Sequence, residues 1–262
     1  MERRVMNRER MIGIVGGMGP EAGLDLARKI LAQTCASRDQ DHIALAMISA
    51  PSGIADRTAF LSGEDTENPG IAIGRVFRRL ASVGAGVIGM PCNTAHSRPI
   101  LRAAEAEIRD LDITFVHMIE EVYRFVRRAY PAATAIGLLS TSGTRRSGVY
   151  QDVFEAGDVR LVVPADDVQR ELIQPAIYNE TYGIKAAAGQ VGDRARNDLR
   201  TAFQTLADRG AQAVILGCTE IPLAITEPEI AEIPVIDATL VLARALVREA
   251  APWKLLEEGD VS

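Results

Sequence analysis

Two cysteines, Cys92 and Cys218, occupy the same place in two similar stretches of the sequence. Each follows a short apolar run of strand length and precedes a pattern typical of a helix start, in Gly86–Thr94 and Ala213–Glu220. A thiol at a helix N-terminus lies near free backbone N–H groups and the positive end of the helix dipole, which lower the pKa of the thiol. The sequence therefore predicts that either cysteine can act as a base.

Two matched acid/base groups suit the inversion of a stereocentre by proton transfer. The proton must leave one face of a carbon and arrive at the opposite face, and the task is the same in both directions. A thiolate on one side and a thiol on the other, exchanged at each turnover, would perform it with shared apparent pKa values. The nearby backbone N–H groups, with Asn93, Thr94 and Thr219, can hold a carboxylate and stabilise the charge that spreads onto it.

Each cysteine is preceded at a similar distance by a cation. Arg57 lies 35 positions before Cys92, and Lys185 lies 33 positions before Cys218. Arginine suits bidentate capture of a carboxylate, whereas lysine offers a compact charge. We predict that Arg57 and Lys185 hold the carboxylate groups of a substrate.

The elements that must position these residues alternate regularly. Short apolar runs are separated by stretches of helical period, a pattern typical of βαβ units with buried parallel strands. The predicted strands span residues 11–15, 43–49, 86–90, 113–118, 135–140, 159–163, 213–217 and 233–237. The predicted fold class is α/β.

The two halves of the chain also resemble one another. Ile12–Val15 matches Ile136–Leu139, and Cys92 matches Cys218 at an offset of 126. Such duplication predicts two pseudosymmetric lobes, each a parallel sheet flanked by helices. Because open parallel sheets bind ligands at the carboxyl ends of their strands, the active site is expected in the cleft between the lobes.

The duplication also suggests where the lobes divide. We predict a first lobe of residues 1–111 plus 232–262, carrying Cys92, and a second lobe of residues 112–231, carrying Cys218.

Composition limits the partners. The chain has 262 residues, 47% hydrophobic and 24% charged, and a formal charge of −6, which argues against general affinity for nucleic acid or an acidic membrane. No apolar stretch reaches the roughly 18 residues that span a bilayer. The segment MERRVMNRER is a poor secretion signal, so we expect a cytoplasmic protein with a small-molecule substrate. Cys35 is expected to be an inert packing residue.

Several segments together resemble the aspartate/glutamate racemase family, most closely its aspartate racemase branch. They cover nearly the whole chain beyond residue 11. The segments are GIVGGMGPEA (13–22), PSGIADRT (51–58), MPCNTAH (90–96), LLSTSGT (138–144), NETYGIKAAAG (179–189) and LGCTEIPLAI (216–225).

This resemblance implies a two-lobed fold, no pyridoxal phosphate or other cofactor, no metal, and commonly a homodimer. It implies that Cys92 and Cys218 are the catalytic acid/base pair and that Arg57 and Lys185 contact substrate carboxylate. The further substrate-binding residues that it implies are Met18, Gly19, Asn93, Thr94, Thr141, Thr144 and Thr219.

The predicted function is thus cofactor-independent racemisation of an amino acid. Aspartate or glutamate is the preferred substrate. Ser52–Ile54 stands where aspartate racemases more often carry a proline-rich stretch, so broad specificity stays open.

Parts of the sequence also fit other functions. The sequence Gly17–Ala22 fits a dinucleotide fingerprint, but the next strand does not end in an acidic residue. His96, four positions after Cys92, would suit a Cys-His amidase but leaves Cys218 unexplained. A decarboxylase of the same family needs only one cysteine and is disfavoured. Open alternatives are a cis-trans isomerase of a small dicarboxylate and a non-catalytic amino acid binding protein. The three histidines lack metal-ligand spacing.

Overall fold

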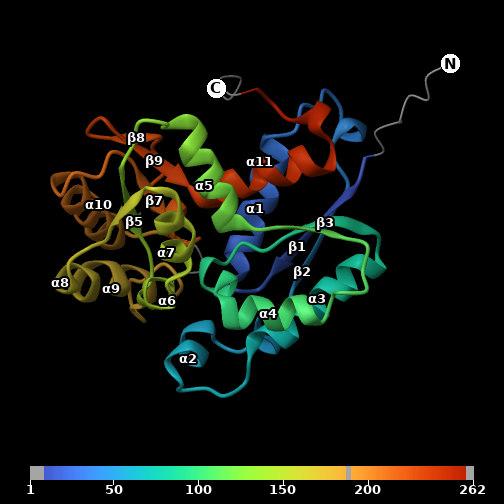
Figure 1. Ribbon diagram of the computed structural model, residues 1–262, viewed down its shortest axis with the longest axis horizontal. Coiled ribbons are helices and arrows are strands. Elements are labelled where there is room, and N and C mark those ends of the chain that lie inside the picture. Colours follow the sequence, from blue (N-terminus) through green and yellow to red (C-terminus); the bar gives the residue numbers. More distant parts are fainter. Residues whose placement is uncertain (1–8, 187–189, 258–262) are drawn as a thin grey trace.

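Two β-sheets form the frame of the molecule, which a computed structural model describes for residues 9–186 and 190–257 (Figure 1). The strands of the first sheet are β1 (Met11–Gly16), β2 (Leu45–Ser49), β3 (Ala85–Gly89) and β4 (Thr114–Val116). Those of the second are β5 (Ala135–Leu139), β6 (Arg160–Val162), β7 (Val214–Leu216), β8 (Glu229–Ile230) and β9 (Ile233–Asp237). The orders are β2-β1-β3-β4 and β6-β5-β7-β9-β8, parallel except for the β8–β9 edge.

Helices cover the faces of both sheets, which confirms the predicted α/β fold. The longer helices are α1 (Pro20–Ala32), α3 (Pro69–Ser82), α4 (Arg98–Ala106), α5 (Met118–Ala129), α10 (Asp193–Asp208) and α11 (Ala238–Ala250). The short ones are α2 (Arg57–Ser62), α6 (Ser142–Ser147), α7 (Val149–Phe154), α8 (Asp166–Val168) and α9 (Gln174–Tyr178). No helix within the described residues has the length and apolar character needed to cross a membrane.

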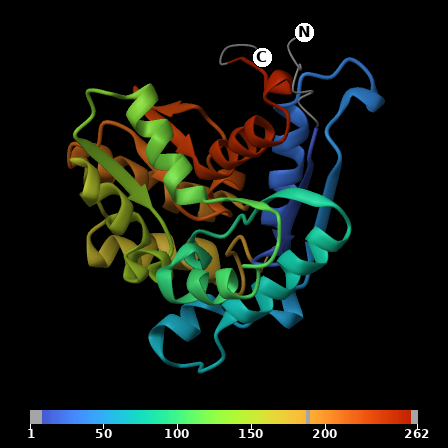
Figure 2. The ribbon, with the colours of Figure 1, turned by 45° about the vertical axis from the view of Figure 1, so that its right-hand side comes forward.

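Three apolar clusters hold these layers together. Side chains of α3 and α4 pack on the outer face of the first sheet, and those of α9 and α10 pack on the outer face of the second. The inner faces of both sheets share one cluster with α1, α5, α7 and α11. Figure 2 shows α11 beside α1 in this shared layer. The two sheets are therefore joined through a common core.

The duplication expected from the sequence appears in matching neighbours of two glycines. Gly13 in β1 and Gly137 in β5 each leave too little room for a side chain, since a Cβ would lie 2.9 Å from Ala85 and 2.8 Å from Val214 respectively. The neighbours of Gly13 are Leu80, Ala85 and Ile88, and those of Gly137 are Leu206, Ala211 and Val214. Each neighbour of Gly13 lies 126 positions before the corresponding neighbour of Gly137, so the same packing occurs in both halves of the chain.

Each predicted strand corresponds to an observed one, and most of their ends lie within two residues of the predicted ends. The predicted strand 113–118 is shorter, because His117 caps α5 by accepting a hydrogen bond from the backbone N–H of Glu120 at 3.2 Å. The two-residue strand β8 was not predicted, since two residues carry no hydrophobic period.

Sheet pairing differs from the predicted division of the lobes. The boundaries after residues 111 and 231 assign β4 to the second lobe and β9 to the first, whereas β4 pairs with β3 and β9 pairs with β7. Helix α11 then packs on the first sheet, where Leu246 contacts Gly89. We propose that the lobe boundaries follow this pairing and fall after β4 and after β9. The residues 1–8 and 258–262 of the predicted first lobe lie outside the described residues.

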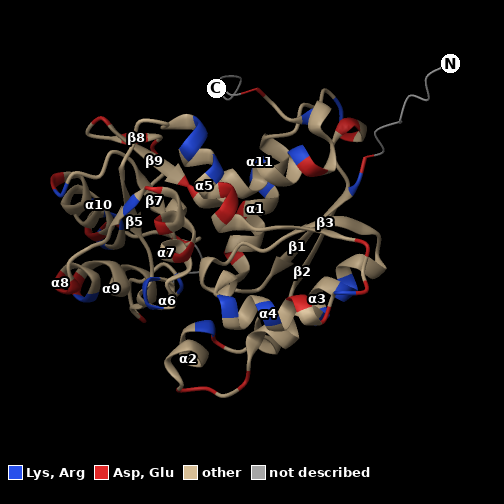
Figure 3. Ribbon diagram, viewed as in Figure 1, with Lys and Arg blue, Asp and Glu red and all other residues tan. Residues whose placement is uncertain are grey.

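Charges of both signs are spread over the outer helices (Figure 3). On α5 they follow the helix dipole, with Glu120 and Glu121 in the first turn and Arg127 and Arg128 in the last. The ends of this helix are therefore stabilised by their own sequence.

Candidate active site

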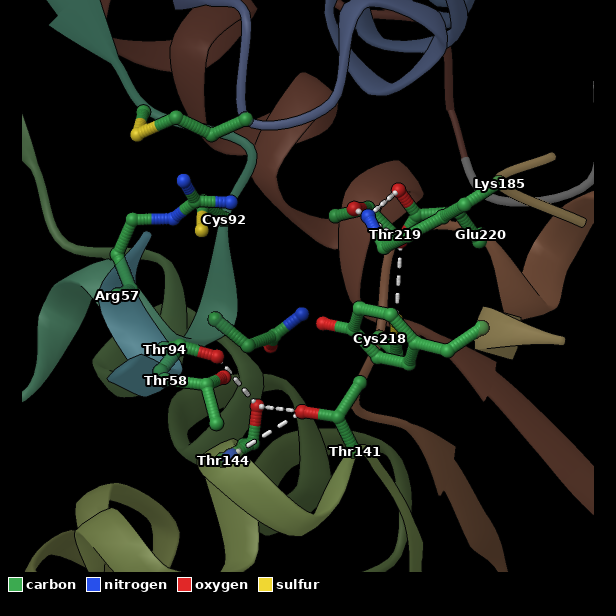
Figure 4. Close-up of a pocket in the computed structure, with 13 residues that line it drawn as sticks. Arg57, Thr58, Cys92, Thr94, Thr141, Thr144, Lys185, Cys218, Thr219 and Glu220 are labelled. Atoms are coloured by element: carbon green, nitrogen blue, oxygen red, sulfur yellow. Dashed lines mark hydrogen bonds and ion pairs between the residues drawn. The ribbon is translucent and has the colours of Figure 1, made fainter. Parts of the chain in front are cut away.

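A pocket lies where the strands β3 and β7 end, and it is shown in Figure 4. Its lining residues are Met18, Arg57, Thr58, Cys92, Asn93, Thr94, Thr141, Thr144, Tyr178, Lys185, Cys218, Thr219 and Glu220. The structure thus brings both cysteines and both predicted cations to one cavity. Residues 187–189, at the end of the lysine segment, lie outside the described residues.

One predicted residue lies elsewhere, and three lining residues were missed. Gly19 borders a neighbouring pocket behind Lys185 and Glu220, and a Cβ at Gly19 would lie 3.3 Å from Glu220 Oε1. Thr58 and Glu220 stand inside the motif segments, directly after the predicted site residues Arg57 and Thr219. This position in the sequence was the signal that could have identified them as lining residues. Tyr178 precedes the lysine segment and carried no comparable signal.

Cys92 follows β3 and is the N-cap residue of a 3₁₀ turn at Asn93–His96. Arg57, the first residue of α2, brings its guanidinium beside the Cys92 sulfur (Figure 4). Burial lowers the pKa of Arg57, but the neighbouring Cys92 and Asp56 outweigh this effect and raise it. The buried Nε of Arg57 has no hydrogen-bond partner among the described residues, so this donor suits an incoming carboxylate.

His96 supports the backbone of Cys92 and does not face its thiol. Nδ1 of His96 lies 2.9 Å from the Cys92 carbonyl oxygen, and Nε2 accepts a hydrogen bond from the Met118 N–H at 3.2 Å. Complete burial lowers the pKa of His96 to about 3, helped by the nearby His117. The ring is therefore neutral, with its proton on Nδ1, and the Cys-His amidase alternative loses its base.

Acid should destabilise the protein through His96. In the unfolded chain a histidine binds a proton below pH 6.5, whereas folded His96 does so only near pH 3, so stability falls as the pH drops through this window. At pH 5 the loss amounts to about 2 kcal/mol. Urea unfolding at pH 7.5 and pH 5 measures it. In His96→Gln the drop between the two pH values should be smaller by this amount, and an unchanged drop contradicts the assignment.

Cys218 belongs to a chain of charged contacts on the other side of the pocket. Its Sγ donates to Glu220 Oε2 at 3.0 Å, and Glu220 Oε1 forms an ion pair with Lys185 Nζ at 2.5 Å. The Thr219 hydroxyl donates to the same carboxylate at 3.3 Å. The Lys185 ammonium lies 5.4 Å from the ring centre of Tyr178. Both charges of the ion pair are thus fixed beside one thiol.

These contacts reverse the predicted pKa shift of Cys218. Burial raises the pKa of this thiol well above its usual range, and the Glu220 carboxylate raises it further, against the opposing effect of Lys185. Lys185 outweighs burial and keeps the pKa of Glu220 low. The predicted helix N-terminus is wrong at both cysteines, because short 3₁₀ turns follow them, at 93–96 and 221–223.

Hydroxyl and amide groups join the two halves across the pocket floor. Thr144 Oγ1 lies 2.8 Å from Thr94 Oγ1 and 3.1 Å from Thr141 Oγ1. The Tyr150 hydroxyl donates to Asn93 Oδ1 at 2.7 Å, and the buried Asn93 Nδ2 has no partner among the described residues. Together with Arg57, these groups offer donors for a carboxylate placed between the cysteines.

The predictions about metal binding and about Cys35 concern the molecule beyond this pocket. Within residues 9–186 and 190–257, no group of three or more His, Cys, Asp or Glu side chains is arranged to hold a metal ion. Cys35 is exposed, which corrects its predicted packing role.

Comparison with known proteins agrees with this geometry. The chain matches the family model of Asp/Glu/hydantoin racemases over residues 15–246. It is 29% identical to the broad specificity amino-acid racemase RacX of Bacillus subtilis over 247 residues, 90% of this chain and 96% of the relative. The aspartate racemase of Picrophilus torridus has a TM-score of 0.75 at 29% identity, covering 95% of this chain and 96% of that one. A glutamate racemase of Francisella tularensis, solved with D-glutamate, shares the fold with a TM-score of 0.62 at 15% identity, over 97% and 85% of the two chains. The family predicted from the motif segments is confirmed, and the chain belongs to the Asp/Glu/hydantoin racemase family of isomerases.

Proposed function

We propose that this amino acid racemase works without a cofactor and uses Cys92 and Cys218 as its two acid/base groups. The observation that supports the proposal is that the two sulfurs come from equivalent strand ends of the two sheets and line one pocket. Figure 4 places Cys92 with Arg57 on one side and Cys218 with Glu220 on the other. A substrate carbon between them would meet one sulfur on each face.

In the proposed reaction, one thiolate takes the α-proton and the other thiol donates a proton to the opposite face. The electron pair of the broken Cα–H bond spreads onto the α-carboxylate in between. Arg57, Asn93 and Thr94 are the donors that would stabilise this charge. After turnover the protonation states of Cys92 and Cys218 are exchanged.

We further propose that aspartate or glutamate is the preferred substrate, with neutral amino acids as weaker ones. Arg57 and Lys185 are both at the pocket, which favours a second carboxylate, but Glu220 already pairs with Lys185. The names of the relatives allow either outcome, since one is a broad specificity racemase and another an aspartate racemase. A homodimer and a cytoplasmic location stay predictions.

Deuterium incorporation tests the proposal directly. The purified protein, without added cofactor, is incubated in deuterated water with L-aspartate, L-glutamate or L-alanine, and chirality and α-hydrogen exchange are followed together. We expect the product enantiomer to carry deuterium from its first appearance, because the delivered proton comes from a second, solvent-exchanged thiol. Inversion with retention of the original hydrogen would contradict a mechanism in which one cysteine removes the proton and the other delivers a different one. Binding without exchange would favour the binding-protein alternative.

A further inference from the structure

We infer that Glu220 is a positioning residue that keeps the resting proton on Cys218, so that Cys92 is the sulfur that is left free to take a proton from the substrate. The inference rests on the proposed two-cysteine function and adds a direction to it. It makes the two halves of the site unequal, although the fold around them is duplicated.

The duplicated motifs differ most in charge two positions after each cysteine. Thr94 follows Cys92 at this position, and Glu220 follows Cys218. The Thr94 hydroxyl is bound to Thr144, whereas the Glu220 carboxylate accepts a hydrogen bond from the Cys218 thiol at 3.0 Å. A carboxylate can accept this bond only from a protonated sulfur, and it repels a thiolate at the same distance.

The cations make the two sides still more unequal. Lys185, the cation on the Cys218 side, is paired with Glu220 at 2.5 Å and lies against the ring of Tyr178. Arg57, the cation on the Cys92 side, lies beside the Cys92 sulfur itself. Positive charge beside a sulfur favours the thiolate, so the charges on both sides act in the same direction.

Other titratable groups near Cys218 do not reverse this preference. Tyr150 and Tyr178 face it, and burial raises the pKa of Tyr178 to about 12 and that of Tyr150 further, so both stay neutral at physiological pH. Besides Glu220, Lys185 is the charge within the described residues that acts on Cys218, and the pKa of Lys185 is raised because Glu220 and Cys218 outweigh burial. The raised pKa of Cys218 agrees with a proton held there at rest.

This arrangement has a kinetic consequence. The resting enzyme is ready for the enantiomer whose α-hydrogen faces Cys92. The opposite enantiomer needs the rarer form with the proton on Cys92, so its apparent KM rises in proportion to that rarity. Because two enantiomers have equal free energies, kcat/KM must be equal in both directions. The kcat of this opposite enantiomer is therefore higher by the same factor as its KM. We expect unequal KM values with equal kcat/KM.

Alkylation by iodoacetamide tests the proton's position without relying on turnover. The Cys35→Ser background removes the exposed thiol, and peptide mass spectrometry follows Cys92 and Cys218 separately. Both residues are 6% exposed, so access is matched and the thiolate fraction should decide the rates. We expect Cys92 to react at least about tenfold faster. Equal rates, or faster labelling of Cys218, would overturn the inference.

Substitutions then assign the effect to Glu220. In Glu220→Gln, Cys218 labelling should rise about tenfold and the two KM values should converge, whereas Glu220→Asp should restore part of the difference. The matched control is Glu227→Gln, because Glu227 is a surface glutamate paired with Arg200, and it should leave both ratios unchanged. Unchanged labelling in Glu220→Gln, with a normal melting temperature, excludes this role.

The two proposals can fail separately. A protein that labels Cys92 first but does not exchange the α-hydrogen of any amino acid contradicts the proposed racemisation and leaves the proton assignment intact. A protein that racemises while both cysteines label equally contradicts only the assignment.

Discussion

Replacing Cys92 with alanine should lower racemisation in both directions by about a thousandfold. Both directions should lose activity because, in the proposed mechanism, each cysteine is the base for one enantiomer and the acid for the other. Cys218→Ala should cause a loss of similar size. The double variant should be little worse than either single one, since the pair acts as a unit.

The residual chemistry of the single variants is as informative as the loss. Cys218→Ala keeps Cys92 and Arg57, so it should still exchange the α-hydrogen of one enantiomer with solvent while failing to invert it. Chiral chromatography with deuterium analysis by mass spectrometry separates the two outcomes. Cys35→Ala is the matched control, because Cys35 is the exposed cysteine outside the pocket, and it should retain full activity. If Cys92→Ala retained inversion, the two-cysteine proposal would be wrong.

Arg57→Ala should lower kcat/KM by about a hundredfold to a thousandfold. This estimate follows from the cost of about 2 to 5 kcal/mol for removing one partner of a buried charged contact. Two effects combine here, since Arg57 faces the Cys92 sulfur and also offers a carboxylate its Nε, which has no hydrogen-bond partner within the described part of the chain. Arg57→Lys keeps the charge but loses the bidentate fork, so it should recover only part of the activity.

Steady-state kinetics can separate these two effects. Loss of carboxylate binding raises KM, whereas loss of the positive charge beside the Cys92 sulfur lowers kcat. Arg38→Ala is a suitable control, because Arg38 is an exposed surface arginine paired with Asp41. Full activity in Arg57→Ala, with a melting temperature like that of the unaltered protein, would show that Arg57 has no role in the reaction.

The charge state of Cys218 could not be predicted from the sequence. The motif LGCTE predicts a strand, a turn and a thiol at its end, and it does not show whether the glutamate faces solvent or sulfur. In the folded protein Glu220 accepts from the thiol and pairs with a lysine 35 positions away. That contact depends on the path of the chain between α9 and β7, and it reversed the expected pKa shift.

Sheet pairing joins segments that are remote in sequence, so local patterns do not specify it. The predicted lobe divisions fall after residues 111 and 231, whereas hydrogen bonding pairs β4 within the first sheet and β9 within the second. The family resemblance likewise implied Gly19 in the cleft, whereas Met18 lines the pocket and Gly19 borders the neighbouring pocket beside Glu220.

The sequence alone determined the α/β class, the duplication and most of the residues that line the pocket. Hydrophobic period, glycine positions and the cysteine offset are local properties of the chain, and parallel strands bring their ends to one edge wherever they pair. Only the tertiary structure decided which charges face which sulfur. Electrostatic effects depend on distances and burial between residues remote in sequence, so the unequal environments of Cys92 and Cys218 arise only when the two halves close around one pocket.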